Sequence, residues 1–364
     1  MKRLFLLFCT ACVLLSFTYA GGKTLTNGEA WTDTSGNIIQ AHDTVVKCGS
    51  KYYWYGLDYS HEKDIGDGNG FRAIKCYESE DLVNWTFKNN VVTNTTSDLL
   101  TMCDVWAPQV VYNKTTEMYV MWLGTSKGCL VFACNKPYGN FHMHNTTFNV
   151  NSWAYVNSIF VDTDGSAYVV SECLNDLSVD EPALMVYALT DDYLELRTDW
   201  NTWGDIYSIC FDTRAIGRTY VLKHKGIYYL FAADYGLLTS ANDNAYSTSR
   251  PSWHDFLGDG NFTYQGMKWA WTSDLLQDWS GLIAFDNTST DYEFGALIAV
   301  QGDEGTSYIV ACNGWDASDM SQSTYTWLPL QWDDDTFLTM DVPVVREYST
   351  ITIDADKGTV SGSN

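Results

Sequence analysis

Short apolar runs recur along this chain in five pairs, each joined by a tight turn and each with a second run that opens on tyrosine. The pairs cover residues 45–55, 110–122, 159–170, 221–231 and 297–310. Runs rich in valine, isoleucine, tyrosine and tryptophan that flank glycine, asparagine or aspartate are typical of β-hairpins. A recurring hairpin indicates one four-stranded blade per repeat. We therefore predict an all-β chain folded as a five-bladed β-propeller.

The chain divides into a short leader and one domain. Met1-Lys2-Arg3 precede an apolar run to about Phe17, which is too short to span a bilayer and is followed by small residues up to Ala20. This pattern predicts a signal peptide over residues 1–20, with a membrane anchor as the alternative. No proline-rich linker or charge block interrupts the remainder. We predict a single propeller domain over residues 21–364 in a secreted, extracellular protein.

Cysteines and glycosylation sequons agree with secretion. Eight of the ten cysteines lie beyond the leader, and an even number suggests disulfides, although their pairing cannot be read from the sequence. Six Asn-X-Ser/Thr sequons suggest a glycoprotein. No cysteine has zinc spacing, so we expect no cofactor or metal, with structural calcium at Asp333-Asp334-Asp335 as a weak alternative. The cysteines are Cys48, Cys76, Cys103, Cys129, Cys134, Cys173, Cys210 and Cys312; the sequons begin at Asn84, Asn94, Asn113, Asn145, Asn261 and Asn287.

Charge and aromatic content narrow the class of partner. The formal net charge is −24, which repels nucleic acid and anionic membranes, so we expect neither as a partner. The chain has 15 Trp and 24 Tyr, more than a core of this size requires. Sugar-binding clefts use such rings because a pyranose has an apolar face, although most of these side chains serve the sheets themselves. We expect a monomer that binds a polysaccharide or glycan.

Several short motifs follow one another along nearly the whole chain: Asp33 to His42, Tyr52-Tyr53-Trp54-Tyr55-Gly56, Ser79 to Trp85, Trp106-Ala107-Pro108, Phe160 to Tyr168, Gly314-Trp315 and Tyr325 to Leu330. Each motif is weak alone, but their order is specific. Together they resemble glycoside hydrolase family 43, and most closely its exo-β-1,3-galactanase-like members. The resemblance implies a secreted propeller with a central sugar site.

The resemblance also implies catalysis by carboxyl groups. One acid protonates the leaving oxygen and a base activates water, about 6.5–9.5 Å apart in inverting enzymes. At the family's acid position this chain has Gly217, and at the position of the carboxylate that tunes the acid it has Val156. Trp106 stands where the galactanase-like members carry a glutamate. A shift in the alignment would let another carboxylate act. The catalytic candidates are Asp43, Asp104 and Asp212.

Five residues are candidates for substrate binding. His42 opens the first inner strand, where a buried core histidine is the alternative, and Trp106 could instead wedge between blades. The resemblance places Trp315 and Trp327 at the galactose site, with stacking on a sugar favoured over core packing. The full set is His42, Trp106, Trp315, Tyr325 and Trp327.

Two functions follow from these candidates, and a third does not need them. The first is an inverting, exo-β-1,3-galactanase-like glycosidase acting on galactose-containing glycans. The second is a catalytically inactive, carbohydrate-binding pseudoenzyme on the same scaffold, favoured by the loss of several functional positions together. The third is an aromatic-rich structural or adhesion protein. The number of carboxylates that face the centre of the propeller separates the first two.

Overall fold

The structure is a computed structural model that describes residues 21–60, 71–101, 103–148, 156–172, 184–197, 207–211, 216–234, 264, 266–285, 291–316, 318–335 and 340–364. Within these residues the chain is all-β, with two short 3₁₀ helices, η2 (Asp98–Leu100) and η3 (Met320–Gln322). No helix in the described part of the chain has the length and apolar character needed to cross a membrane. The predicted signal peptide lies outside the described residues.

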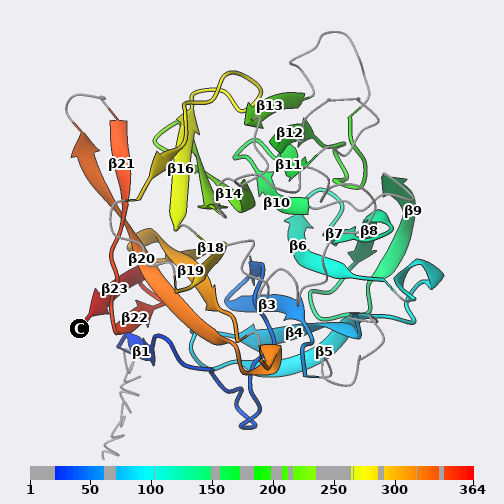
Figure 1. Cartoon of the computed structure of the whole chain (residues 1–364), viewed down its shortest axis with the longest axis horizontal. Helices are drawn as coiled ribbons and strands as arrows, with labels where there is room; N and C mark the ends of the chain where they lie inside the picture. The colour runs from blue at the N-terminus through cyan, green and yellow to red at the C-terminus, as the bar shows by residue number, and fades with distance from the viewer. Residues whose placement is uncertain are drawn as a thin grey trace, which may run out of the picture.

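The described strands form six antiparallel sheets (Figure 1). Five have four strands and one has three. The four-stranded sheets are β2 (Val45–Cys48), β3 (Lys51–Leu57), β4 (Ala73–Ser79) and β5 (Thr86–Thr93); β6 (Val105–Asn113), β7 (Met118–Thr125), β8 (Gly128–Cys134) and β9 (His142–Phe148); β10 (Val156–Val161), β11 (Ala167–Glu172), β12 (Leu184–Ala188) and β13 (Tyr207–Phe211); β14 (Ile216–His224), β15 (Ile227–Asp234), β16 (Met267–Thr272) and β17 (Ile283–Ala284); and β18 (Glu293–Gly302), β19 (Gly305–Gly314), β20 (Thr324–Asp335) and β21 (Met340–Val345). The three-stranded sheet is β1 (Lys23–Thr26), β22 (Thr350–Asp354) and β23 (Thr359–Ser363).

The prediction of a five-bladed propeller was wrong, because the propeller has six sheets. The sixth sheet joins the two ends of the described chain, with Lys23 of β1 opposite Ile353 of β22. Its strands contain no tyrosine, so a search for hairpins that open on tyrosine could not detect them. Pairing between segments this far apart in sequence also leaves no local signal in the alternation of apolar and polar residues.

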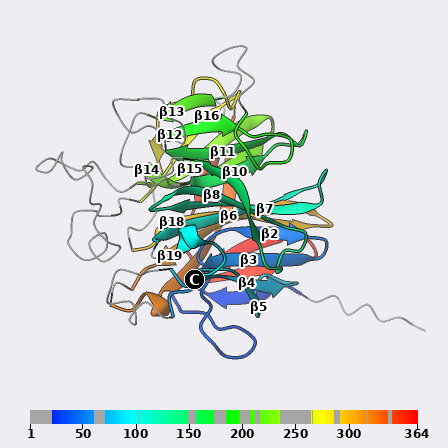
Figure 2. The same cartoon turned by 90° about the vertical axis from the view of Figure 1, so that its right-hand side faces the viewer.

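The first strands of the four-stranded sheets lie next to one another around the centre (Figures 1 and 2). β6 contacts β2 and β10, β14 contacts β10 and β18, and β18 contacts β2. The sheet β1-β22-β23 packs against β18, β19 and β20. The sequence just before or at the start of each first strand therefore approaches the middle of the molecule.

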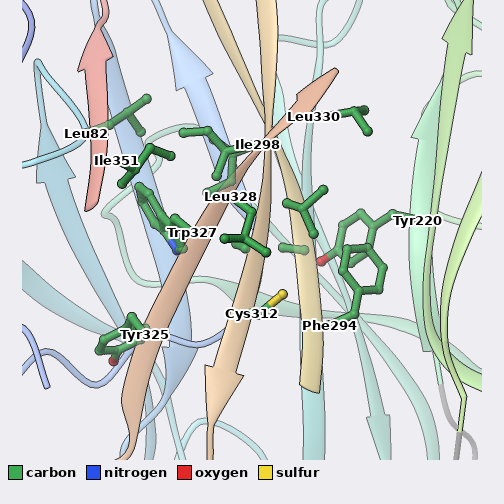
Figure 3. Packing of buried hydrophobic residues seen from close by; sticks show 14 of the residues in the cluster. Leu82, Tyr220, Phe294, Ile298, Cys312, Tyr325, Trp327, Leu328, Leu330 and Ile351 are labelled. Carbon is green, nitrogen blue, oxygen red and sulfur yellow. The ribbon is translucent and has the colours of Figure 1, made fainter. Parts of the chain in front are cut away.

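Aromatic and aliphatic side chains fill the space between the sixth sheet and its neighbour (Figure 3). Trp327 of β20 is fully buried, and its ring lies 5.0 Å from Trp31 and 5.2 Å from Trp54. The side chain of Asn27 connects this core to the N-terminal segment, since its Nδ2 donates to Trp327 O and its Oδ1 accepts from Trp327 N, each at 2.9 Å. The first residues of the domain are thus part of its core.

The cysteines whose side chains are described are free thiols: Cys48, Cys76, Cys103, Cys129, Cys134 and Cys312. The predicted disulfides are therefore not found among them, and the side chains of Cys173 and Cys210 lie outside the described part. All six except Cys48 are buried, and burial raises the pKa of Cys129. A buried thiol of this kind packs like a small apolar side chain.

Candidate functional site

Two carboxylates and one guanidinium meet near the centre of the propeller. Asp43, just before β2, forms an ion pair with Arg218 of β14. Glu293, the first residue of β18, has its Oε1 3.9 Å from Arg218 Nε. All three side chains are at most 5 % exposed. Charges this deeply buried persist only when they are paired, so Arg218 is the cation that allows both carboxylates to remain there.

A β-bulge directs Arg218 to this place. The register of β14 against β15 shifts between Gly217 and Tyr220, and Arg218 has a φ of +46°. A left-handed conformation is costly for a residue other than glycine. This conformation places the guanidinium next to Asp43. A comparable bulge interrupts β6 between Trp106 and Gln109, where Ala107 has a φ of +36°.

His42 lies beside this cluster and is fixed on both ring nitrogens. Its Nδ1 is 3.2 Å from Asn313 Oδ1, and its Nε2 is 3.2 Å from the Tyr325 hydroxyl. The backbone of His42 can lie this close to β3 because residue 56 is glycine, where a Cβ would come within 2.4 Å of His42 N. Burial lowers the pKa of His42 to about 3, although the hydrogen bond that Nδ1 donates to Asn313 Oδ1 acts in the opposite direction. The imidazole is therefore neutral at pH 7.

Trp315 gives the cluster an aromatic edge that is only half-buried. Its Nε1 donates to Glu293 Oε2 at 2.5 Å. Its ring lies 4.6 Å from His42 and 5.6 Å from Tyr59, measured between ring centroids. A carboxylate next to a partly exposed indole offers hydrogen-bond acceptors and an apolar face together, which is the combination that sugars require.

Hydroxyl and amide groups continue the buried polar network on the other side of Asp43. Thr44 Oγ1 lies 3.0 Å from Gln109 Oε1 and 3.5 Å from the Tyr220 hydroxyl. Gln109 Nε2 in turn donates to Ala107 O at 3.2 Å. The network links the residue before β2 to the middle of β6 and of β14, so the relative positions of these strands are held by hydrogen bonds as well as by packing.

The structure brings some of the predicted site residues together and separates others. Asp43, His42, Trp315 and Tyr325 belong to one cluster. Asp104 is exposed just before β6, and Trp106 is half-buried on that strand. Trp327 is fully buried in the core, where its ring has no exposed face. Asp212 lies outside the described residues. The roles assigned to these residues stay predictions.

Sequence reasoning missed Arg218, Glu293 and Asn313. Arg218 is a single charge within an otherwise uncharged stretch of β14, and Glu293 opens the apolar run of β18. A charge inside a buried strand is rare unless it is paired, so both residues carried a usable signal. Asn313 carried none, because a polar residue near a strand end is ordinary. Among the described residues, no three His, Cys, Asp or Glu side chains are grouped as metal ligands would be.

The free energy of unfolding should respond to pH through two opposing groups. Burial raises the pKa of Asp43 from 3.8 to about 6, so the folded state binds more protons and stability falls as the pH rises from about 4 to 6. The pKa of His42 falls from 6.5 to about 3, so the contribution of His42 is present above pH 6.5 and is lost as the pH falls towards 3. The two slopes oppose each other in the wild type.

Removing the histidine should expose the contribution of Asp43. Between pH 4 and pH 6, we expect the free energy of unfolding of His42→Gln to fall by about 3 kcal/mol relative to the same variant with Asp43→Asn, measured by urea denaturation. The control is His42→Gln combined with Asp43→Asn, which should lack this fall. Identical pH profiles for the single and the double variant would contradict the assignment to Asp43.

Comparisons with known proteins agree with this architecture. The exo-β-1,3-galactanase of Clostridium thermocellum is 26% identical with a TM-score of 0.72, over 93% of this chain and 68% of that one. The exo-β-1,3-galactanase of Phanerochaete chrysosporium, solved with galactose, is 22% identical with a TM-score of 0.71, over 94% and 71%. A family 43 β-1,3-galactosidase solved with galactodeoxynojirimycin is 18% identical with a TM-score of 0.67, over 89% and 99%. A sequence search of curated proteins gave no significant match.

The family assignment rests on sequence as well as on fold. The sequence model of glycosyl hydrolases family 43 matches residues 37–259. This range includes Asp43 and Arg218 and extends over more than half of the chain. The resemblance read from the motifs is thereby confirmed, with the galactanase-like fold that it implied. This chain is a member of glycosyl hydrolases family 43.

Proposed function

We propose that the protein binds galactose-containing glycans at the cluster around Trp315 and Glu293, and that it does not hydrolyse them. The observation that carries this proposal is the buried ion pair between Arg218 and Asp43, with Glu293 also beside the guanidinium. Inverting hydrolysis needs one carboxyl group that can give a proton and another that can take one from water. Here a single guanidinium compensates the charges of both Asp43 and Glu293.

Arg218 cannot serve as the general acid. A guanidinium keeps its proton at any physiological pH, so it cannot protonate a leaving oxygen. The resemblance places the family's general acid at Gly217, directly before Arg218. Loss of general acid catalysis alone lowers a rate by about 10²–10⁴-fold. Recognition does not depend on that proton transfer, so it can survive without catalysis.

The recognition surface fits a neutral sugar. Trp315 presents a half-buried ring, and Glu293 lies within hydrogen-bond reach of the indole nitrogen. Such a pair can contact the apolar face of a pyranose and accept from its hydroxyls. The galactose in the Phanerochaete exo-β-1,3-galactanase structure supports galactose as the first sugar to test.

The test is incubation of the protein with β-1,3-galactan and β-1,3-galactotriose, with released galactose and calorimetric binding measured in parallel. We expect saturable binding without release. Trp315→Ala should weaken binding at least tenfold, because it removes the ring on which the sugar would stack. Phe87→Ala is the control, since Phe87 is 41 % exposed on the outer strand β5. Galactose release, or undiminished binding by Trp315→Ala, would contradict the proposal.

Hydrolysis is the second candidate, and one observation favours it. A carboxyl group with a pKa of about 6, as burial gives Asp43, is in the range that suits a general acid near neutral pH. If galactose is released, Asp43→Asn should abolish the release. Release that persists in Asp43→Asn would assign the chemistry to another carboxylate, with Asp212 the next to replace.

We also propose that this binding takes place outside the cell. The support is the basic start and short apolar run of residues 1–20. Expression of the full chain in a eukaryotic secretory host, followed by N-terminal sequencing of the protein in the medium, should give a mature chain that begins at or near Gly21. Retention in the membrane with an intact Met1 would contradict cleavage.

A further inference from the structure

Three polar or charged residues form a cross-strand row at one end of the sheet β18–β21. Glu293 of β18 is directly opposite Asn313 of β19, and Asn313 is directly opposite Tyr325 of β20. Side chains opposite one another in neighbouring antiparallel strands are about 5 Å apart at Cβ and point to the same face. All three are at most 5 % exposed. The row therefore presents a carboxylate, an amide and a phenol side by side inside the protein.

His42 lies against this row and uses both ends of the Asn313 amide. Asn313 Nδ2 donates to the main-chain oxygen of His42 at 3.1 Å, which places Oδ1 at 3.2 Å from His42 Nδ1. An amide oxygen can only accept, so the proton of the neutral imidazole belongs on Nδ1. The Tyr325 hydroxyl is 3.2 Å from Nε2 and 2.6 Å from the main-chain oxygen of Ile39, so its proton can serve either acceptor.

Gly295 makes this contact sterically feasible. It lies at the β18 bulge between Phe294 and Ala296, where a Cβ would come within 2.5 Å of Asn313 Nδ2 and 3.2 Å of the main-chain oxygen of His42. Any side chain at position 295 would push the amide away from the histidine. The absence of a side chain here is therefore required by the Asn313–His42 pair.

The orientation of His42 affects the position of Trp315, the ring proposed to contact a glycan. The imidazole is stacked on Tyr325 at 4.6 Å with an interplanar angle of 14°, and it also contacts the Trp315 ring at 4.6 Å and the Tyr59 ring at 5.8 Å. Trp315 is held at its far edge by Glu293. A rotation of the imidazole would move the indole, because closely packed rings cannot turn independently.

We infer that Asn313 is a positioning residue that fixes the ring orientation and the Nδ1–H tautomer of His42 and thereby sets the Trp315 ring for glycan binding. The assignment of the His42 tautomer follows from the contacts alone, whereas the effect on glycan binding rests on the proposed function. Burial also keeps His42 neutral, which is the state that the amide of Asn313 is built to bind.

The experiment combines imidazole nitrogen NMR of ¹⁵N-histidine-labelled protein with calorimetric titration of β-1,3-galactotriose. The His42 signal is assigned with His42→Gln. The variants are Asn313→Leu, which removes both hydrogen bonds, and Asn313→Asp, which keeps the acceptor for Nδ1. The matched control is Asn113→Leu, because Asn113 is 1 % exposed and its Nδ2 donates to the main-chain oxygen of Asp191 at 2.8 Å, away from this row.

In the wild type we expect the nitrogen shifts of an Nδ1–H imidazole. Asn313→Leu should lose that signature and bind the trisaccharide about tenfold more weakly. Asn313→Asp should keep the Nδ1 proton and make both binding and the His42 signal depend on pH, because a carboxylate at this place favours the imidazolium. Asn113→Leu should be less stable, with an unchanged His42 signal and unchanged binding.

Two results would overturn the inference: an unchanged His42 signature in Asn313→Leu, or a lost signature with wild-type affinity. If Asn313→Leu does not fold, Asn313→Asp decides the question through its pH dependence. If the wild type binds no glycan, the proposed function fails. In that case the NMR comparison still decides whether Asn313 fixes His42.

Discussion

Replacing Arg218 with methionine is expected to lower the free energy of unfolding by about 3–5 kcal/mol, measured by urea denaturation at pH 7. Arg218 is 2 % exposed, and it neutralises Asp43 directly while its Nε lies 3.9 Å from Glu293. Methionine replaces the apolar stem of arginine and has no charge, so the two carboxylates would be left close together without a cation. Removing one member of a buried ion pair costs more than the pair contributes, because the partner charge stays desolvated.

A second substitution separates this effect from a general packing defect. Adding Asp43→Asn to Arg218→Met removes one uncompensated charge and should recover a large part of the lost stability. The matched control is Lys51→Met, since Lys51 pairs with Glu78 at 2.9 Å but is 38 % exposed, and its loss should cost far less stability than that of Arg218. A loss of stability below about 1 kcal/mol in Arg218→Met, or no recovery in the double variant, would mean that the guanidinium does not stabilise the buried carboxylates of Asp43 and Glu293.

The local part of the fold was readable from the sequence. The five predicted hairpins correspond to the first two strands of the five four-stranded sheets, such as β2 and β3, where Val45 lies opposite Trp54. Alternation of apolar residues and turn chemistry determine such pairs because both strands are adjacent in the chain. The sixth sheet pairs β1 with β22, and no local pattern reports that two distant strands will meet. The predicted number of sheets was therefore one too low.

The site was predictable where it follows the strands and hidden where the backbone departs from them. His42 and Asp43 were found because they precede the first inner strand. Arg218 reaches Asp43 only through a bulge with a left-handed residue, and the alternation of a regular strand does not indicate which way such a side chain points. Asn313 depends on Gly295, whose significance appears only when β18 and β19 are paired.

The pattern of burial also revised the aromatic candidates. Trp315 and Trp327 were grouped because the resemblance places both at the galactose site, yet only Trp327 is buried in the core. Trp315 follows the end of β19 and stays half-buried, whereas Trp327 lies inside β20 among Trp31 and Trp54. A tryptophan suits either place, since its large apolar surface serves a core as well as a sugar site. Only the position of each residue relative to its strand end distinguishes the two.

Gly302→Ala is expected to lower the free energy of unfolding by about 3 kcal/mol, because the partly buried contact between two turns has no room for an added methyl group. A Cβ at position 302 would lie 2.1 Å from Gly358 N and 2.3 Å from Asp356 O, so it would meet backbone on the turn between β22 and β23. Backbone cannot rotate away as a side chain can. The contact also holds two hydrogen bonds, Asp303 N to Asp356 O at 2.8 Å and Glu304 N to Lys357 O at 2.9 Å.

The loss in Gly302→Ala should be concentrated in the sixth sheet. Amide hydrogen exchange of β22 and β23 should accelerate more than that of β6 and β7, because the added methyl group separates the β18–β19 turn from the C-terminal hairpin. Gly281→Ala is the matched control, since a Cβ there would meet nothing within 4 Å, and it should leave stability within about 0.5 kcal/mol. Uniform acceleration across all sheets would instead mean that the sixth sheet unfolds together with the rest of the propeller, and an unchanged stability would mean that the two turns are not in contact.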